Sequence, residues 1–332
     1  MFGIEDIGID LGTATVIVFL KSKGIVFNEP TVVAIDRYSG KMIALGEEAR
    51  QMLGRTPGNI VAVRPLRSGV IADYSMTEWI LQHILHKVVK KHLLFRPRVM
   101  VCIPSGATGV EQRAVKEAVI QSGARQAHLI EEPVAAALGA GIQIEEPSGH
   151  MIVDVGGGTT DVAVLSLGGI VCSRSIRVAG NNFDEAIIRF VRKKYNLMIG
   201  ERTAEELKIG IGTAYPKAKE HGASLLIRGR DLVSGLPETR AITAEETAIA
   251  LQEPVTQIID TVKEVLEQTA PELAADIIER GIVMTGGGCL LHGMDLLLSE
   301  ETGLAVNVAE DPTLCVARGT GISLGMMNVL QT

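Results

Sequence analysis

Aromatic residues are scarce in this 332-residue chain: phenylalanine, tyrosine and tryptophan make up 3% of it, with a single tryptophan. Proteins that bind single-stranded nucleic acid stack the bases on aromatic side chains, and this chain has few with which to build such a platform. Its formal net charge of −7 would also repel a phosphate backbone. We therefore expect no nucleic-acid partner.

Cysteines and long apolar runs are also few. The four cysteines are scattered, without a Cys-x-x-Cys pair, which disfavours disulfides and zinc and is typical of a reducing cytosol. No uninterrupted apolar stretch approaches the roughly 18 residues that span a bilayer, and the first residues carry no signal-peptide pattern. The sequence predicts a cytoplasmic protein and leaves attachment to a membrane surface open.

Apolar residues, at 46%, and glycine, at 36 residues, are abundant. This balance is typical of α/β proteins with many tight turns, and the length suggests about two domains. The predicted elements are hairpin-spaced strands over about 6–35, an irregular stretch over 54–74, a helix over about 76–92, a strand over 98–103 and a helix over 110–123, then strands over 151–178, a helix over 182–195, a polar excursion over 197–244, a long helix over 244–268 and a strand over 280–285.

One pattern occurs twice. An apolar strand contains an aspartate near its end, a Gly/Thr-rich turn follows, and a second apolar strand begins, first over residues 9–19 and again over 153–165. Glycine in such a turn tolerates positive φ and leaves backbone N–H groups uncovered. A lone turn of this kind is usually only a hairpin. Two of them, with a third strand that runs into glycines over 282–289, indicate two related halves that hold one phosphate chain.

These motifs resemble those of the actin-like ATPase superfamily, which includes actins, sugar kinases and heat-shock chaperone ATPases. The matching segments are the phosphate loops Asp10–Thr15 and Asp154–Asp161, the adenosine loop Thr285–Cys289, and the connecting helices Ile130–Ala136 and Ala317–Gly321.

Within that superfamily the chain is similar, from end to end, to the MreB family of bacterial actins with its paralogues Mbl and MreBH. Two departures from the family pattern are Thr15, where asparagine is usual, and Ser68, where aspartate is usual. The most specific stretches are Gly54–Gly58, Gly69–Tyr74, Ile199–Glu205 and Gly229–Pro237.

The resemblance implies an α/β actin-like fold, in which two duplicated ribonuclease-H-like domains flank a nucleotide cleft and each carries a smaller inserted subdomain. The first half is expected over 1–145 and 315–332, with its insertion over about 33–65. The second half is expected over 146–314, with its insertion over about 181–245.

The resemblance also implies a site for ATP and Mg²⁺. Asp10 and Asp154 would hold Mg²⁺, mostly through water, because this ion dehydrates reluctantly. For Asp10, capping of its own turn is the structural alternative. Backbone donors of the two turns would hold the phosphates, and these residues are Gly12, Thr13, Ala14, Thr15, Gly156, Gly157 and Gly158.

For hydrolysis, Glu132 is the candidate that positions the attacking water, because it would project from a helix start into the cleft, and Thr159 would help to orient that water. The alternative is a carboxylate that complements the helix macrodipole, a role that fits the neighbouring Glu131 better.

The adenosine would lie against Glu205 and Lys208, which are three residues apart on a predicted helix and so share a face. Without the resemblance, a solvated ion pair would be the preferred interpretation of these two residues. The backbone of Gly286, Gly287 and Gly288 would admit the adenosine closely.

An apolar loop over 92–95 lies in a basic stretch with no acid between Lys87 and Arg98. A loop with apolar side chains and basic flanks can bind the surface of an anionic bilayer. The alternative is that these apolar side chains form a small separate core beneath the loop. Members of the family use a loop here for membrane attachment, which predicts that Leu94 and Phe95 insert.

The resemblance therefore implies a cytoplasmic filament protein at the inner face of the cell membrane, which hydrolyses ATP slowly as a regulatory step and organises wall synthesis to maintain rod shape. The implied partners are other copies in double protofilaments, the anionic membrane, and wall-synthesis membrane proteins of the MreC, MreD and RodA type.

The main alternative function is a small-molecule kinase, such as a sugar kinase, on the same fold. It would need a catalytic aspartate base and a sugar pocket, and neither is identifiable in the sequence. A chaperone ATPase would need a peptide-binding domain, which we do not expect after the last helix.

Overall fold

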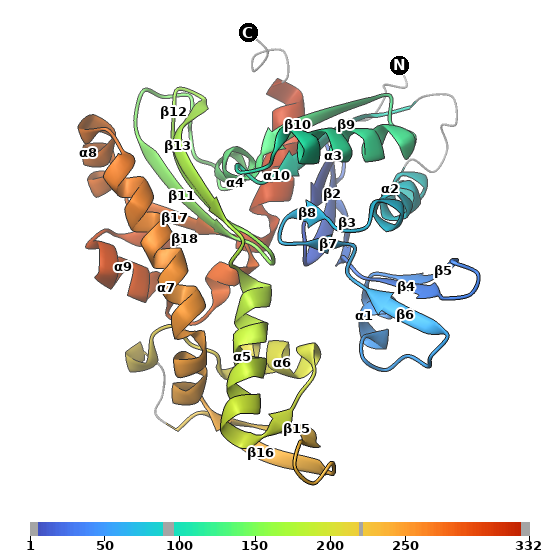
Figure 1. Ribbon diagram of the computed structural model, residues 1–332. Coiled ribbons are helices and arrows are strands. Elements are labelled where there is room, and N and C mark those ends of the chain that lie inside the picture. The colour runs from blue at the N-terminus through green and yellow to red at the C-terminus, as the bar shows by residue number, and fades with distance from the viewer. Residues whose placement is uncertain (1–5, 89–95, 219–221, 327–332) are drawn as a thin grey trace.

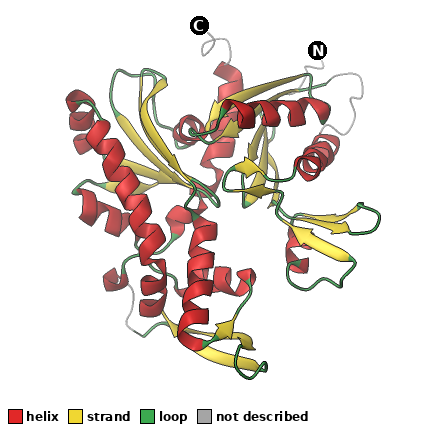
Figure 2. Ribbon diagram, in the orientation of Figure 1, coloured by secondary structure: helices red, strands yellow, loops and turns green. Residues whose placement is uncertain are grey.

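The computed structural model describes residues 6–88, 96–218 and 222–326. The molecule has two lobes, each built on a five-stranded sheet (Figure 1). A smaller sheet lies at the outer end of each lobe, and helices cover the larger sheets (Figure 2). The α/β class and the two-lobed, duplicated architecture that the sequence predicts are confirmed.

The first large sheet has the strand order β10-β9-β1-β2-β3. Its first two strands form the predicted hairpin, in which Asp10 is opposite Ile17. The strands β1 and β9 are parallel, as are β9 and β10. The bounds are β1 (Ile7–Leu11), β2 (Thr15–Leu20), β3 (Gly24–Pro30), β9 (Arg98–Ile103) and β10 (Gln126–Glu131).

The second large sheet repeats this arrangement, with the order β18-β17-β11-β12-β13 and the same mixture of parallel and antiparallel neighbours. All residues of β11 are buried, as expected for a strand with both faces covered. The bounds are β11 (His150–Val155), β12 (Thr160–Ser166), β13 (Gly169–Ile176), β17 (Ile282–Thr285) and β18 (Val306–Val308).

The smaller sheets belong to different lobes. One contains β4 (Val33–Asp36), β5 (Met42–Leu45) and β6 (Ile60–Val63), with α1 (Glu47–Met52) packed beside it. The other contains β14 (Leu197–Met198), β15 (Ser224–Asp231) and β16 (Pro237–Thr243).

Two helices lie between the large sheets. The helices α4 (Glu132–Gly139) and α10 (Cys315–Met326) share one apolar core with β9, β10, β11 and β12. Their backbones touch, because a Cβ atom on Gly139 would lie 1.8 Å from the carbonyl oxygen of Cys315, and one on Gly319 would lie 1.7 Å from that of Ala135. This crossing holds the two lobes together behind the phosphate loops.

The other helices cover the outer faces of the sheets. Capping boxes begin α3 at Thr108 and α7 at Thr243, because a threonine side chain there satisfies an N–H group that the helix leaves free. The helices α2 and α3 pack on the first large sheet, and α5 and α7 pack on the second. The bounds are α2 (Tyr74–Val88), α3 (Gly109–Gln121), α5 (Gly180–Tyr195), α6 (Glu201–Ile211), α7 (Ala244–Gln268), α8 (Pro271–Arg280) and α9 (Met294–Thr302), with short 3₁₀ turns η1 (Pro216–Ala218), η2 (Gly287–Leu290) and η3 (Pro312–Leu314).

The stretch 54–74 differs from its predicted irregular conformation. It contains β6 and a small hairpin of β7 (Leu66–Arg67) and β8 (Val70–Ile71). The strands are too short for a clear alternation of apolar and polar residues, which is why the sequence pattern did not indicate them. The helix predicted over 76–92 begins earlier, at Tyr74, and its predicted end lies outside the described residues.

Candidate functional site

The two Gly/Thr turns meet each other between the lobes. A Cβ atom on Gly157 would lie 2.5 Å from the Cβ atom of Ala14, and one on Gly158 would lie 2.4 Å from Oγ1 of Thr13. Only glycine permits this approach. The sequence placed these turns in separate halves, and the structure brings them together.

Each turn is also held by its own lobe. In the first turn, Gly12 has no room for a side chain, because a Cβ atom would lie 2.7 Å from the carbonyl oxygen of Thr15. The hydroxyl of Thr31 donates to the carbonyl oxygen of Gly12 at 2.7 Å. In the second turn, the N–H group of Gly156 donates to the carbonyl oxygen of Thr159 at 2.9 Å. These contacts therefore restrain the backbone of each turn within its own lobe.

The second turn also rests on the first residues of α5. The N–H group of Gly180 donates to the carbonyl oxygen of Gly156 at 3.1 Å, and that of Asn181 donates to the carbonyl oxygen of Gly157 at 2.8 Å. These contacts use the carbonyl groups of the turn, so they do not consume its N–H groups.

Asp10 and Asp154 occupy equivalent positions in the two sheets, and each accepts a hydrogen bond from the neighbouring parallel strand. Cys102 on β9 donates to Oδ1 of Asp10 at 3.3 Å, and Thr285 on β17 donates to Oδ1 of Asp154 at 2.7 Å. Burial raises the pKa of Asp10 to about 6 and that of Asp154 to about 7, and these donors partly offset the rise. The two aspartates are near enough for the negative charge of Asp10 to raise the pKa of Asp154.

A second acidic pair completes the centre. Glu132 is the first residue of α4, as predicted, and its carboxyl group lies near that of Asp161 of β12, whose negative charge acts on it. Asp161 accepts bonds from the backbone N–H group of Ser105 at 2.8 Å and from its hydroxyl at 2.7 Å. Burial, followed by the negative charges of Asp161, Asp154 and Asp10, raises the pKa of Glu132 well above its usual value.

Asp161 and Ser105 were not among the predicted site residues. The signal for Asp161 was present, because a hairpin that begins its turn after Asp154 places Asp161 directly opposite, and cross-strand neighbours lie on the same face. Ser105 comes from the other lobe and had no such local signal.

These four carboxyl groups suit a cation. The negative charges of the others raise the pKa of Glu132, and those of Asp161 and Asp10 raise the pKa of Asp154, so a bound cation would relieve a repulsion that burial makes costly. Among the described residues, no group of three or more His, Cys, Asp or Glu side chains is arranged so that it could hold a metal ion directly. Carboxylate oxygens are ligands that Mg²⁺ accepts, and this ion keeps most of its waters and uses few protein ligands.

Thr159 is buried beside the small β7–β8 hairpin. A Cβ atom on Gly69 would lie 2.6 Å from Cγ2 of Thr159, and the N–H group of Gly69 donates to Oγ1 of Thr13 at 3.0 Å. The hairpin thus touches both phosphate turns. Its turn residues Ser68 and Gly69 both have positive φ, 49° and 74°, a conformation that Asp and Asn adopt more readily than Ser.

Glu205 and Lys208 lie on α6, as predicted, but each contacts a different partner. Lys208 Nζ lies 2.8 Å from Oδ1 of Asp184 and donates to the carbonyl oxygen of Gly180 at 3.1 Å. Glu205 accepts a bond from Arg50, which lies on α1 in the other lobe. The alternative of a simple Glu205–Lys208 ion pair does not describe these contacts.

The three glycines of the predicted adenosine loop have different roles. A Cβ atom on Gly286 would lie 2.3 Å from the carbonyl oxygen of Val155, and one on Gly288 would lie 2.4 Å from a methyl group of the same residue. Both therefore allow the loop to pack on β11. Gly287 is exposed and is the one of the three that remains open to a ligand.

The predicted membrane residues Leu94 and Phe95 lie outside the described residues. Lys87, at one side of that segment, lies 5.1 Å from the ring centroid of Phe27. None of the helices in the described part of the chain is long and apolar enough to cross a bilayer.

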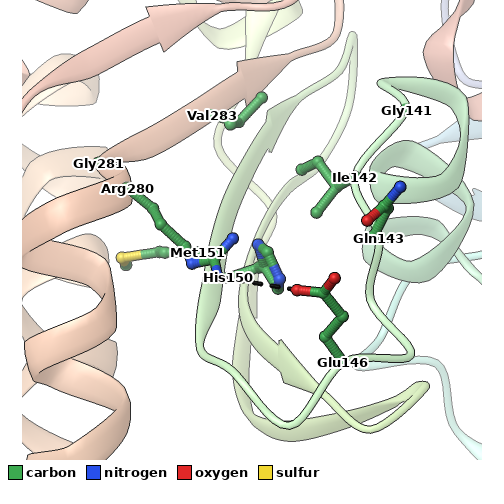
Figure 3. Close-up of a pocket in the computed structure, with 9 residues that line it drawn as sticks. All are labelled: Gly141, Ile142, Gln143, Glu146, His150, Met151, Arg280, Gly281 and Val283. Carbon is green, nitrogen blue, oxygen red and sulfur yellow. Dashed lines mark ion pairs between the residues drawn. The ribbon is translucent and has the colours of Figure 1, made fainter.

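A separate cavity of about 310 Å³ lies at the start of β11, away from the aspartate near its end (Figure 3). An ion pair of 3.8 Å joins Arg280 and Glu146 beside it. None of the predicted site residues lines this cavity, which is bounded by Gly141, Ile142, Gln143, Glu146, His150, Met151, Arg280, Gly281 and Val283.

Two lobes with one strand order, joined by a helix crossing and meeting at paired Asp-bearing turns, define an actin-like fold. Solved structures agree. The crystal structure of MreB 5 of Spiroplasma citri bound to AMPPNP superposes with a TM-score of 0.93 at 41% identity, over 100% of this chain and 99% of that one. The MamK double helical filament superposes with a TM-score of 0.81 at 21% identity, over 97% of this chain and 98% of that one, and so supports the fold alone.

Sequence comparison identifies the family. Residues 4–332 match the MreB/Mbl protein family. The chain is 55% identical to the cell shape-determining protein Mbl of Bacillus subtilis (strain 168), over 98% of this chain and 97% of that protein. It is 52% identical to the cell shape-determining protein MreB of Escherichia coli (strain K12), over 98% and 94%. The chain belongs to the MreB/Mbl family.

Proposed function

We propose that this protein is an ATP-binding cytoskeletal filament protein that determines cell shape. The observation that carries the proposal is the contact between two Asp-bearing glycine turns beside four carboxyl groups, because such a centre suits a metal-bound phosphate chain. The Spiroplasma citri relative has been solved with AMPPNP and with ADP, and the Mbl and MreB relatives are named cell shape-determining proteins.

The phosphate chain would lie along the two turns where they meet, and the hydrogen bonds described above hold the backbones of these turns in place. Asp10 and Asp154 would hold Mg²⁺ largely through its waters, and the ion would supply positive charge to the phosphates. Thr159 and the backbone N–H groups of Gly157 and Gly158 would contact the phosphates, whereas the N–H group of Gly156 donates to the carbonyl oxygen of Thr159. Glu205, Lys208 and Gly287 would contact the adenosine.

Glu132 would position the attacking water. Its position at the start of α4 fixes the backbone, and its carboxyl group lies near Asp161, which Ser105 holds in place. A carboxylate with a raised pKa can also take up the proton that water loses. Hydrolysis in such a protein would be slow and would change the state of a filament.

The first test separates a filament protein from a small-molecule kinase on the same fold. We expect the purified protein to sediment as polymer with Mg·ATP and to phosphorylate no sugar. Phosphorylation of a sugar without any sedimentable polymer would overturn the proposal. A micrograph taken with ATP and anionic lipid would show double protofilaments.

A second prediction concerns magnesium. Asp10→Asn or Asp154→Asn should weaken binding of Mg·ATP about 10- to 100-fold, the usual effect of disturbing groups around a metal, and should weaken metal-free ATP less. Nucleotide titration with Mg²⁺ and with a chelator measures the difference. Glu253→Gln, an exposed residue of α7, is the control. Equal losses with and without Mg²⁺ would make the aspartates structural.

A third prediction concerns the membrane. We propose that the protein lies in the cytoplasm at the inner membrane face and that Leu94 and Phe95 insert there. Burial of two large apolar side chains contributes about 3–6 kcal/mol at most, so a monomer would bind weakly and a filament with many loops strongly. Serine at both positions should abolish co-sedimentation with anionic liposomes while ATP binding remains, and undiminished pelleting would place the attachment elsewhere.

The proposed partners are other copies of this chain, the anionic bilayer, and wall-synthesis membrane proteins of the MreC, MreD and RodA type.

The proposed division of the chain into domains is a first half of residues 1–145 and 315–332 and a second half of residues 146–314. The two large sheets, which separate at the segment between β10 and β11, support this division.

A further inference from the structure

Two ion pairs cross between the outer parts of the lobes. Nη1 of Arg50, on α1, lies 3.2 Å from Oε2 of Glu205 on α6. Nε of Arg64, which follows β6, lies 3.7 Å from Oε2 of Glu201 at the start of α6. The helix α1 and β6 belong to the first lobe and α6 belongs to the second (Figure 1).

Each side of the Arg50 contact is fixed within its own lobe. The guanidinium group of Arg50 also holds Glu47 at 3.1 Å, and Ala49 beside it is fully buried. On the other side, Ala204 and Leu207 of α6 are fully buried in the core of the second lobe. The pair therefore joins two packed elements rather than two free side chains.

The exposures of the two pairs differ. The side chains of Arg50 and Glu205 are 38% and 30% exposed at 3.2 Å, whereas in the longer pair, at 3.7 Å, Arg64 is 22% and Glu201 is 66% exposed. Solvent screens an exposed pair more strongly. The Arg50 pair should therefore contribute more, and the Arg64 pair should support it.

We propose that Arg50 and Arg64 hold the two lobes together across the opening of the nucleotide cleft, and we call these two ion pairs the latch. Bound nucleotide would then leave only after both ion pairs open. This inference rests on the proposed function, in which Glu205 contacts the adenosine. Arg50 bonds to Oε2 of Glu205, which leaves Oε1 of the same carboxylate for a ribose hydroxyl. One side chain would then both touch the nucleotide and close the cleft above it.

The test is the release rate of a fluorescent ATP analogue, chased with excess ATP in the presence of Mg²⁺. Arg50→Ala should release the analogue about 2- to 5-fold faster, the range expected for loss of one partly exposed pair. Arg202→Ala is the matched control, because Arg202 pairs with Glu206 at 2.9 Å within α6 and does not cross the cleft. Its release rate should equal that of the unmodified protein.

The pair of Arg64 and Glu201 allows a second test, in which the two opposite charges are exchanged and Glu205 is left unchanged. Arg64→Glu and Glu201→Arg should each speed release, and the double variant should restore the original rate. Thermal unfolding of each variant checks that it is folded. An unchanged release rate in folded Arg50→Ala, or a double variant no slower than the single ones, would overturn the latch. Failure of the unmodified protein to bind the analogue would instead overturn the proposed function.

Discussion

Replacement of Glu132 by alanine should slow phosphate release about 100-fold, the usual loss when a general base or water-positioning group is removed. ATP should still bind, because the turns and the aspartates that would hold the phosphates remain. The reason is geometric: Glu132 begins α4 beside Asp161 and the phosphate turns, and no other described acid occupies that helix start except its neighbour Glu131. Single-turnover phosphate release at saturating Mg·ATP measures the effect.

Glu131 supplies the control for this experiment. It precedes α4 and makes no capping hydrogen bond with its side chain, so Glu131→Ala should leave turnover within about 3-fold, less than a catalytic loss. Unchanged turnover in Glu132→Ala would contradict the assignment of Glu132. A loss of ATP binding in the same variant would instead indicate that Glu132 supports the phosphate site.

Gly319→Ala should destabilise the protein by about 2–3 kcal/mol, the cost of overpacking a tight contact. The added Cβ atom would lie 1.7 Å from the carbonyl oxygen of Ala135, and a helix backbone cannot yield as a side chain can. Gly139→Ala meets the same obstacle at Cys315. Urea unfolding measures the free energy.

A second glycine of α10 is the control. Near Gly325 the closest atom to an added Cβ is the flexible Nζ of Lys21, at 3.6 Å. Gly325→Ala should therefore be neutral or stabilise the protein by up to about 1 kcal/mol through helix propensity. Equal stability of Gly319→Ala and the unmodified protein would show that α4 and α10 can separate without cost.

Local sequence patterns were enough to predict the hairpins of the large sheets and strands β9 and β17, but not β10 or β18. The apolar runs of β1 and β11 lead into turns whose glycines have no room for a side chain. The glycines in the sequence therefore mark the places where the folded backbone requires them. Glu132 could be placed because Pro133 marks the start of a helix. These features depend on residues that are close in sequence.

Contacts between distant segments could not be predicted in this way. The bond from Ser105 to Asp161 joins two lobes, and so does the bond from Arg50 to Glu205. Nothing near Arg50 in the sequence distinguishes it from an ordinary surface arginine. The role of Gly69 also depends on its contact with Thr159, which only the folded chain brings about.

The two lobes repeat one another in strand order but not in the residues near their turns. Strand β12 places Asp161 opposite its aspartate, whereas β2 places the buried Ile17 there. The helix α4, which follows β10 of the first large sheet, begins with Glu132, and α10, which follows β18 of the second, begins with Cys315. A clamp of true two-fold symmetry would accept a phosphate chain in either direction. This broken symmetry gives the cleft a polarity, so that only one end of a nucleotide can face the acidic pair.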